Sequence, residues 1–265
     1  MHIIVPIKQV PETNAVRMDE ETGTMVREGV AAIVNPLDLY AIEVAIRLRE
    51  AHGGNVTALS MGPPKAASAL REAIAMGCDG GVLISDKAFA GSDTWATSYV
   101  LAAAIRKLGN ADLTVCGERA TDGDTGQVGP GIAGFLGLPV LTYVSKVDAV
   151  ADGSVRVHRL VESGYEVLEA DLPCVLTVVK EAADPRLPTL RGKQKARRAD
   201  LPVWGPDDLD VEKDKLGLAG SPTRVVKIFR PTVARQCEKL PAGSDAAIAA
   251  AVDRFAALVR ERGVG

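Results

Sequence analysis

The chain has 265 residues, of which 47% are hydrophobic and 25% are charged, and its formal net charge is −3. This is an ordinary globular composition, sufficient for one large domain or two small ones with a hydrophobic core. The near-neutral charge excludes a whole-chain electrostatic attraction to nucleic acid or to an anionic membrane. No apolar run approaches the roughly 20 residues that span a bilayer, so we expect a cytoplasmic protein.

The four cysteines are widely spaced and form no CxxC pair (Cys78, Cys116, Cys174 and Cys237). This pattern predicts reduced, mostly buried thiols, and it indicates neither a disulfide framework nor a zinc site.

Apolar runs alternate with segments of helical periodicity from the first residues to about Pro139. The predicted strands are His2–Ile7, Asn55–Gly62, Gly81–Asp86 and Asp112–Gly117, and the predicted helices between them are Leu37–Glu50, a segment that ends at Gly77, and Ser92–Gly109. Short connections between such elements predict an α/β domain with a doubly wound, mainly parallel sheet.

The pattern changes after Pro139. The stretches SVRVHRLV and YEVLEADLPCVLTVVK predict a β-rich appendage on the same domain. From Glu181 to about Pro231 the periodicity fades while proline and charge increase, which is typical of a long surface arm. A last helix is expected over Ser244–Arg262. We therefore predict one domain with its appendage over 1–182, and an extended arm with a C-terminal helix over 183–265.

The loop that follows the fourth strand, ERATDGDTGQVGPGIAG (118–134), contains the densest group of candidate ligand residues. Ligands of open parallel sheets bind at such carboxyl ends. Backbone N–H groups at the following helix start, with the Thr125 hydroxyl and the Gln127 amide, predict a phosphate site. Asn35–Asp38, expected to cap the first helix, and Met61–Pro64 lie at the same edge. Together they favour a nucleotide pocket, although ordinary capped helix starts would give the same pattern.

Other site types receive little support. Gly129, Gly131 and Gly134 match G-x-G-x-x-G, but eleven residues separate Gly129 from Gly117, whereas the dinucleotide fingerprint follows its strand directly. There is no P-loop and no nucleophile elbow, and the three histidines are isolated. Asp122 and Asp124 lack a third metal ligand, so we favour hydrogen bonding to ribose or amide groups for them. We predict no catalytic side chain and no metal site.

The arm carries a basic stretch, Arg186–Arg198, with six Lys or Arg residues and no acidic residue. It has no interleaved aromatic residues, which disfavours nucleic acid. A solvated charged loop is one interpretation. Leu187 and Leu190 among the charges indicate another, an apolar anchor ringed by positive charge that docks onto an acidic partner.

Several stretches, in order over nearly the whole chain, resemble the β subunit of electron transfer flavoproteins: VPIKQVPET, NPLDLYAIEVAIRLRE, SMGPP, AIAMGCD, DGDTGQVGP and RLPTLRGKQKARRADLPV. The resemblance implies an adenine nucleotide α hydrolase-like fold. It also implies a heterodimer in which the α subunit carries FAD, the β subunit carries a second nucleotide, and electrons are exchanged with partner dehydrogenases.

The compact loop DGDTGQVGP and the stretch SDKAFAGSDTWATSYVLA resemble the electron-bifurcating branch, whose β subunit holds FAD. This implies that the heterodimer accepts a hydride from NADH. One electron would go through the α-subunit FAD to an acyl-CoA dehydrogenase-type flavoenzyme, and the other to ferredoxin or flavodoxin. The alternative is the non-bifurcating branch, with a structural AMP. Thr13, where that branch has Tyr, favours bifurcation. Redox activity is expected only in the heterodimer.

The resemblance also implies residue roles. Leu190, Arg191 and Lys193 would dock the redox partner, and Asp93, Thr94 and Thr97 would lie beside the flavin. The adenylate and phosphate contacts would be made by Pro6, Asn35, Asp38, Met61, Gly117, Asp122, Gly123, Asp124, Thr125, Gln127 and Val128.

Two functions from other classes are weaker interpretations of the same sequence. A nucleotide hydrolase or adenylating enzyme of this fold would use a loop of the S-G-G-x-D-S type, which the chain lacks. A nucleotide-sensing module would not need the arm that carries Leu190.

Overall fold

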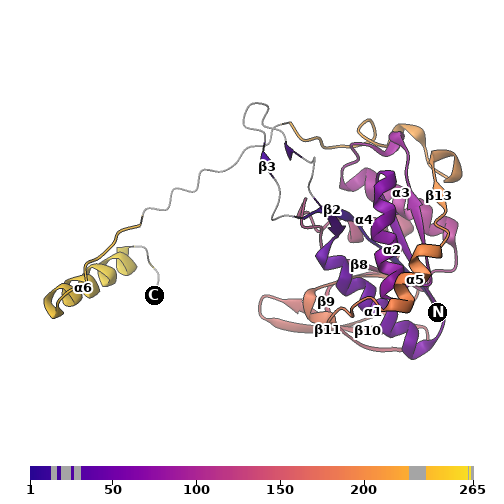
Figure 1. Cartoon of the computed structure of the whole chain (residues 1–265). Helices are drawn as coiled ribbons and strands as arrows, with labels where there is room; N and C mark the ends of the chain where they lie inside the picture. Colours follow the sequence, from indigo (N-terminus) through magenta and orange to yellow (C-terminus); the bar gives the residue numbers. More distant parts are fainter. Residues whose placement is uncertain (13–16, 19–24, 27–30, 227–236, 262, 264–265) are drawn as a thin grey trace. The chain divides into compact units, whose positions relative to one another are not determined.

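Figure 1 shows the computed structural model of the chain, which describes residues 1–12, 17–18, 25–26, 31–226, 237–261 and 263. The chain divides into two compact units, Met1–Val226 and Lys227–Gly265. Residues 183–226, assigned above to the arm, lie within the first unit, and the predicted boundary after residue 182 stays a prediction.

The first unit is built on a nine-stranded sheet with the order β11-β10-β9-β12-β8-β1-β6-β7-β13. Its parallel strands are nearly continuous apolar runs, as burial on both faces requires. The predicted mainly parallel α/β sheet is confirmed. Six strands that are adjacent in this order, from β12 at one side to β13 at the sheet edge, run parallel to one another. They are β12 (Cys174–Val178), β8 (Leu113–Gly117), β1 (His2–Pro6), β6 (Asn55–Met61), β7 (Gly80–Ile84) and β13 (Val203–Trp204).

Helices cover both faces of this sheet (Figure 1). Alternate residues of β1 enter different cores, because successive side chains of a strand point to opposite faces. Ile3 packs in the core with α1 and α2, and Ile4 packs in the core with α3 and α4. The helices of the first unit are α1 (Pro36–His52), α2 (Ala67–Met76), α3 (Thr94–Leu108), α4 (Val128–Leu136) and α5 (Leu190–Arg198).

The β-rich appendage is continuous with the main sheet. It consists of β9 (Val140–Ala151), β10 (Ser154–Val161) and β11 (Gly164–Asp171). The start of β9 pairs parallel with β12, and the rest of β9 pairs antiparallel with β10. Tyr143 lies in the parallel part, with a positive φ of 54°, and its N–H donates to the Thr177 hydroxyl at 3.1 Å.

Two small antiparallel sheets complete the described strands of this unit. One pairs β2 (Gln9–Pro11) with β5 (Ala32–Val34), and the other pairs β3 (Arg17–Met18) with β4 (Met25–Val26).

The arm is more regular than the sequence predicts, because it contains α5 and the edge strand β13. Thr189 caps α5 by accepting the N–H of Gly192 at 2.9 Å. Gly192 allows α5 to approach α2 closely, since a Cβ built there would lie 2.1 Å from the Ala75 carbonyl oxygen. Ala196 is the one residue of α5 that is fully buried. A helix with so small a buried face leaves no apolar periodicity in the sequence, which explains why the pattern predicts an irregular arm.

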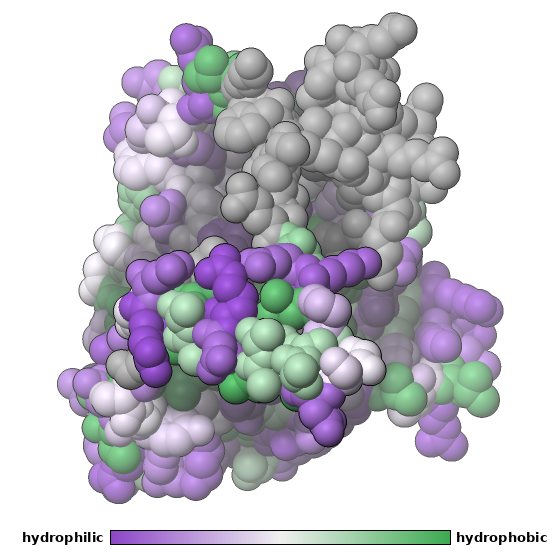
Figure 2. Space-filling view, turned by 90° about the vertical axis from the view of Figure 1, so that its left-hand side faces the viewer, coloured by the Kyte–Doolittle hydropathy of each residue, from purple (hydrophilic) through white to green (hydrophobic). Residues whose placement is uncertain are grey.

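Within the second unit, the structure describes one helix, α6 (Asp245–Glu261), close to the predicted range. None of its described residues is buried within this chain. Its exposed residues include the apolar Ile248, Val252 and Phe255, and Figure 2 shows apolar and polar residues intermixed on the surface of the chain. No helix in the described part of the chain combines the length and the apolar character that crossing a membrane requires.

Candidate functional site

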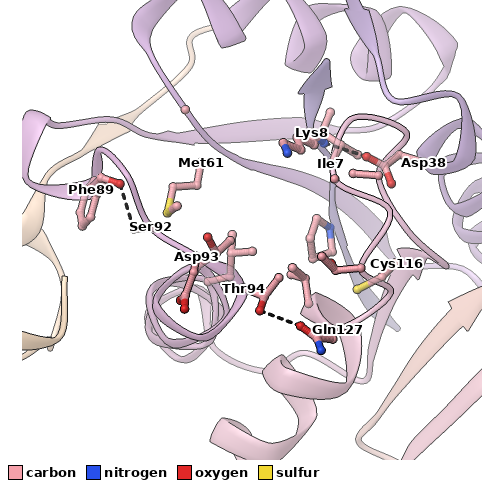
Figure 3. Close-up of a pocket in the computed structure, with 18 of the residues that line it drawn as sticks. Ile7, Lys8, Asp38, Met61, Phe89, Ser92, Asp93, Thr94, Cys116 and Gln127 are labelled. Carbon is pink, nitrogen blue, oxygen red and sulfur yellow. Dashed lines mark hydrogen bonds between the residues drawn. The ribbon is translucent and has the colours of Figure 1, made fainter. Parts of the chain in front are cut away.

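A cavity of about 990 Å³ lies at the carboxyl ends of β1, β6, β7 and β8 (Figure 3). This is the edge where the sequence predicts a ligand site, and the volume is at the upper end of the roughly 300–1,000 Å³ typical of ligand pockets. Eleven of the fourteen residues predicted to contact a cofactor line it: Pro6, Asp38, Met61, Asp93, Thr94, Thr97, Gly117, Gly123, Thr125, Gln127 and Val128. The other three, Asn35, Asp122 and Asp124, are not among its lining residues.

Asp38 is a buried carboxyl in the wall, and only 6% of its surface is exposed. Its Oδ2 accepts the backbone N–H of Lys8 at 2.7 Å. Burial nevertheless raises the pKa of Asp38 from 3.8 to about 7, because the hydrogen bond does not fully replace the lost hydration. Near neutral pH this group is therefore divided between a protonated form, which can donate a hydrogen bond, and a charged form.

Gly117 is where β8 passes closest to the start of α1. A Cβ at this position would lie 2.5 Å from Oδ1 of Asp38 and 2.8 Å from the carbonyl carbon of Leu37. Cβ atoms do not come this close to other heavy atoms, so the wall around Asp38 depends on glycine at this position.

Asn35 does not cap α1, contrary to the prediction, although it occupies the N-cap position. Its buried side chain instead holds the loop after β8. The amide nitrogen donates to the carbonyl oxygen of Arg119 at 2.9 Å, and the amide oxygen accepts the N–H of Thr121 at 3.1 Å. Asn35 therefore fixes one cavity wall to another without lining the cavity.

Asp122 and Asp124 form ion pairs with cations that line the cavity. Lys8 Nζ lies 2.8 Å from Asp122 Oδ1, and Arg119 Nε lies 2.9 Å from Asp124 Oδ1. Exposed pairs of this kind contribute little free energy, so a ligand phosphate can replace the carboxylate at small cost. The predicted direct contacts of both Asp residues with a ligand stay predictions.

The loop leads into the N-terminus of α4, where the N–H groups of Val128 and Gly129 can favour an anion, whereas Pro130 has no N–H. Gln127 precedes this helix, and its Oε1 accepts a hydrogen bond from the Thr94 hydroxyl at 2.9 Å. Two glycines of the G-x-G-x-x-G match allow close packing. A Cβ at Gly129 would meet Cγ2 of Thr177 at 2.4 Å, and one at Gly131 would meet Oγ of Ser98 at 2.4 Å.

The opposite part of the cavity combines apolar side chains with polar ones, among them Lys87, Ser92 and Asp93. Met61, Phe89 and Leu101 line it, with Pro63 and Pro64 nearby, and Figure 3 shows Met61 and Phe89 on the side away from Lys8 and Asp38. A flat aromatic ring system fits such a surface, whereas phosphates fit the end formed by the loop and α4.

Asp93 precedes α3 at this end of the cavity. Its Oδ1 accepts the N–H groups of Trp95 and Ala96, so Asp93 caps the helix. Burial raises the pKa of this carboxyl, but hydrogen bonds, the one from the Ala96 N–H foremost, outweigh that effect and hold the pKa below its usual value.

Sequence reasoning missed the cations of the cavity, namely Lys8, Lys87 and Arg119. Lys8 and Arg119 come within two residues of the ends of β1 and β8, and that position was the available signal. Thr13, expected to distinguish two branches of the family, lies outside the described residues. Among the residues that the structure describes, no group of His, Cys, Asp and Glu side chains is arranged to hold a metal ion.

The predicted docking residues lie together at the start of α5, on the outer surface. Leu190 is 82% exposed, and Leu187 before it is 86% exposed. Arg191 and Lys193 are exposed in the same turn. A large apolar side chain held in water beside positive charges is typical of a protein docking site.

A cluster of ion pairs anchors the arm just before α5. Arg186 Nε lies 2.8 Å from Oε2 of Glu43, and Arg186 Nη1 lies 2.6 Å from Oε1 of Glu50. Glu43 is 2% exposed. Burial raises the pKa of Glu43, but the hydrogen bonds from Arg186 and Arg47 outweigh this and lower it below its ordinary value.

Comparison with known proteins gives a consistent result. Residues 22–209 match the family described as "Electron transfer flavoprotein domain". The chain is 48% identical over 256 residues to the electron transfer flavoprotein subunit beta of Thermoanaerobacterium thermosaccharolyticum, covering 96% of this chain and 98% of the relative. It is 47% identical to subunit CarD of the caffeyl-CoA reductase-Etf complex of Acetobacterium woodii, with 87% and 88% covered. It is 46% identical to protein FixA of Azorhizobium caulinodans, with 88% and 85% covered.

Proposed function

The chain belongs to the electron transfer flavoprotein family as a β subunit, and from this we propose that its cavity binds FAD and that it acts in electron bifurcation. Family membership implies an α-subunit partner. In the proposed function the heterodimer accepts a hydride from NADH. It then sends one electron to an acyl-CoA dehydrogenase-type flavoenzyme through the α-subunit FAD and the other to ferredoxin or flavodoxin.

The observation that carries the proposal is the two-ended cavity of about 990 Å³. A mononucleotide needs only the polar end near Gly117, Thr125 and the start of α4. The further part around Met61 and Phe89 leaves room for a second, aromatic half, which favours a dinucleotide such as FAD over AMP.

The residues present fit this group. The wall at Gly117 admits close approach of a ligand because it carries no side chain. Thr125 and Gln127 would bind the phosphates with the N–H groups of α4, and Lys8 and Arg119 would supply positive charge. Thr94 and Thr97 would lie beside the ring system. Bound FAD would supply hydride acceptance and one-electron transfer.

The contribution of the chain to the chemistry is therefore binding and electrostatics. Hydride transfer needs no acid or base from the protein, so no side chain is assigned as catalytic. Asp38, which is half-protonated near pH 7, can hydrogen-bond to a neutral ribose or adenine group in either form.

The relatives and the docking surface support the proposed partners. CarD is named as a subunit of a complex with a caffeyl-CoA reductase, which favours a partner that acts on acyl-CoA compounds. The exposed Leu190, flanked by Arg191 and Lys193, suits a partner with an apolar pocket and an acidic rim.

The test is to denature the purified heterodimer and to count the released nucleotides by chromatography. Two FAD per heterodimer support the proposal, whereas one FAD and one AMP contradict it and indicate a simple electron shuttle. Thr125→Ala should lower the content of the β-site nucleotide only. Thr121→Ala is the matched control, because Thr121 lies in the same loop but does not line the cavity.

A further inference from the structure

One wall of the cavity is held from outside by a segment far along the chain. Lys87, Phe89 and Asp93 belong to the loop between β7 and α3, and they line the cavity. The segment 217–223, the last part of the arm before the second unit, contacts the same loop. The Leu218 N–H donates to the carbonyl oxygen of Ala90 at 3.0 Å.

Asp93 is the centre of this contact. While its Oδ1 caps α3, its Oδ2 accepts the N–H of Thr223 at 2.9 Å and the Thr223 hydroxyl at 2.8 Å. Its own N–H donates to Oγ of Ser221 at 2.8 Å. The carboxylate thus receives four hydrogen bonds, which is about its full capacity.

The expected role of Asp93 as a ligand contact therefore needs another interpretation. A carboxylate whose acceptor sites are already occupied by protein donors is not available for a ligand. Its hydrogen bonds instead fix the start of α3, where Thr94 and Thr97 line the cavity, to the segment that carries Ser221 and Thr223.

The backbone fit at this junction is close. Gly217 has a positive φ of 57°, and a Cβ there would lie 2.3 Å from the carbonyl oxygen of Ala88. Gly91, with φ of 77°, faces Leu218, and a Cβ there would lie 3.1 Å from Cβ of Leu218. Both positions require glycine, so the loop and the segment fit each other in one arrangement.

We propose that Ser221 and Thr223 are positioning residues for the nucleotide cavity, because they hold Asp93 and with it the wall that faces the ring half of the ligand. This inference rests on the proposed function, and it assigns to the arm a second task besides partner docking.

The sharpest test is the double variant Ser221→Ala/Thr223→Val, which removes both hydroxyls and keeps the Thr223 N–H and side-chain shape. FAD and AMP are titrated calorimetrically into the heterodimer that retains its α-subunit FAD. We expect the dissociation constant of FAD to rise about tenfold, since the Asp93 carboxylate loses the hydrogen bond from the Thr223 hydroxyl and the Asp93 N–H loses its acceptor, Oγ of Ser221. Hydrogen exchange should show faster exchange of the Asp93 amide.

Two controls separate positioning from general damage. The single variant Thr223→Ser keeps the hydroxyl and should bind FAD with wild-type affinity. Ser154→Ala removes a comparable bond, from Ser154 Oγ to Glu169 at 2.9 Å in the β10–β11 pair, and should leave affinity unchanged.

The results distinguish the two proposals. If the wild type binds FAD and the double variant binds it within twofold as tightly, or if Asp93 exchange is unchanged, the positioning role is wrong and the proposed function stands. If the wild type does not bind FAD at this site, whether or not it binds AMP, the proposed function is wrong and the positioning role falls with it.

Discussion

Replacing Asp38 with Asn should make the isolated chain more stable above pH 7 and leave its stability near pH 4 almost unchanged. The folded chain holds this carboxyl with a pKa of about 7, whereas its ordinary value is 3.8. Between these values the folded state binds more protons than the unfolded state. The contribution of this group is therefore fully present below pH 3.8 and is lost as the pH rises through 7.

The size of the effect follows from the shift. A difference of about three pKa units at 1.36 kcal/mol per unit corresponds to roughly 4 kcal/mol. Asn has nearly the same shape as Asp and retains an oxygen for the N–H of Lys8, which lies 2.7 Å from the carboxylate. The variant should therefore keep the bond and avoid the cost of a buried charge.

The assay is urea unfolding of the wild type and Asp38→Asn at intervals from pH 4 to pH 8. The difference in the free energy of unfolding should grow with pH, most steeply between pH 4 and 7. Asp148→Asn is a control of opposite sign, because the hydrogen bond and charge of Lys146 lower the pKa of this exposed carboxyl. Parallel pH profiles for the wild type and Asp38→Asn would refute the reasoning.

Three further predictions concern binding, docking and stability. Gly117→Ala should reduce the affinity of the cavity for its nucleotide at least about tenfold, because the new Cβ meets Asp38 and Leu37. Gly134 has open space around it, so Gly134→Ala should bind the nucleotide normally in the same titration. Leu190→Ala should raise the KM for the flavoenzyme partner about tenfold with unchanged melting temperature. Val203 is another exposed apolar residue, and Val203→Ala should leave the KM unchanged. Equal KM values for wild type and Leu190→Ala would exclude docking through Leu190. Arg186→Met should lower the free energy of unfolding in urea by about 2 kcal/mol, since Glu43 stays buried with one partner fewer. Lys213→Met breaks an exposed ion pair with Asp207 and should change that free energy by less than about 0.5 kcal/mol. Similar losses in both variants would contradict this reasoning.

The central sheet was predictable because its strands are buried on both faces. The run at His2–Pro6 needs apolar residues on each side, so its sequence has an unbroken signal. The start of α3 was equally readable, since Asp93 caps it locally. Both features depend on residues close together in the sequence.

Features that depend on distant residues were harder to predict. Asn35 precedes a helix and has the residue type of a cap, but its side chain bonds to residues 119 and 121. Similarly, α5 is held by a glycine contact with Ala75 and not by an apolar face. The cations of the cavity, such as Lys8, differ from other surface lysines only by where β1 ends. A local pattern contains no information about such partners.

The bridge made by Asn35 has a consequence for synthesis of the chain. Its partners lie 84 and 86 residues further on, and the sheet beside them is completed only when β12 pairs with β8. During synthesis, the cavity residues near Asn35 are therefore made before the residues around Arg119 and Thr121 that complete the wall. The proposed nucleotide can therefore be bound only after residue 178, the last residue of β12, has been synthesised, so its loading would follow the completion of this part of the sheet.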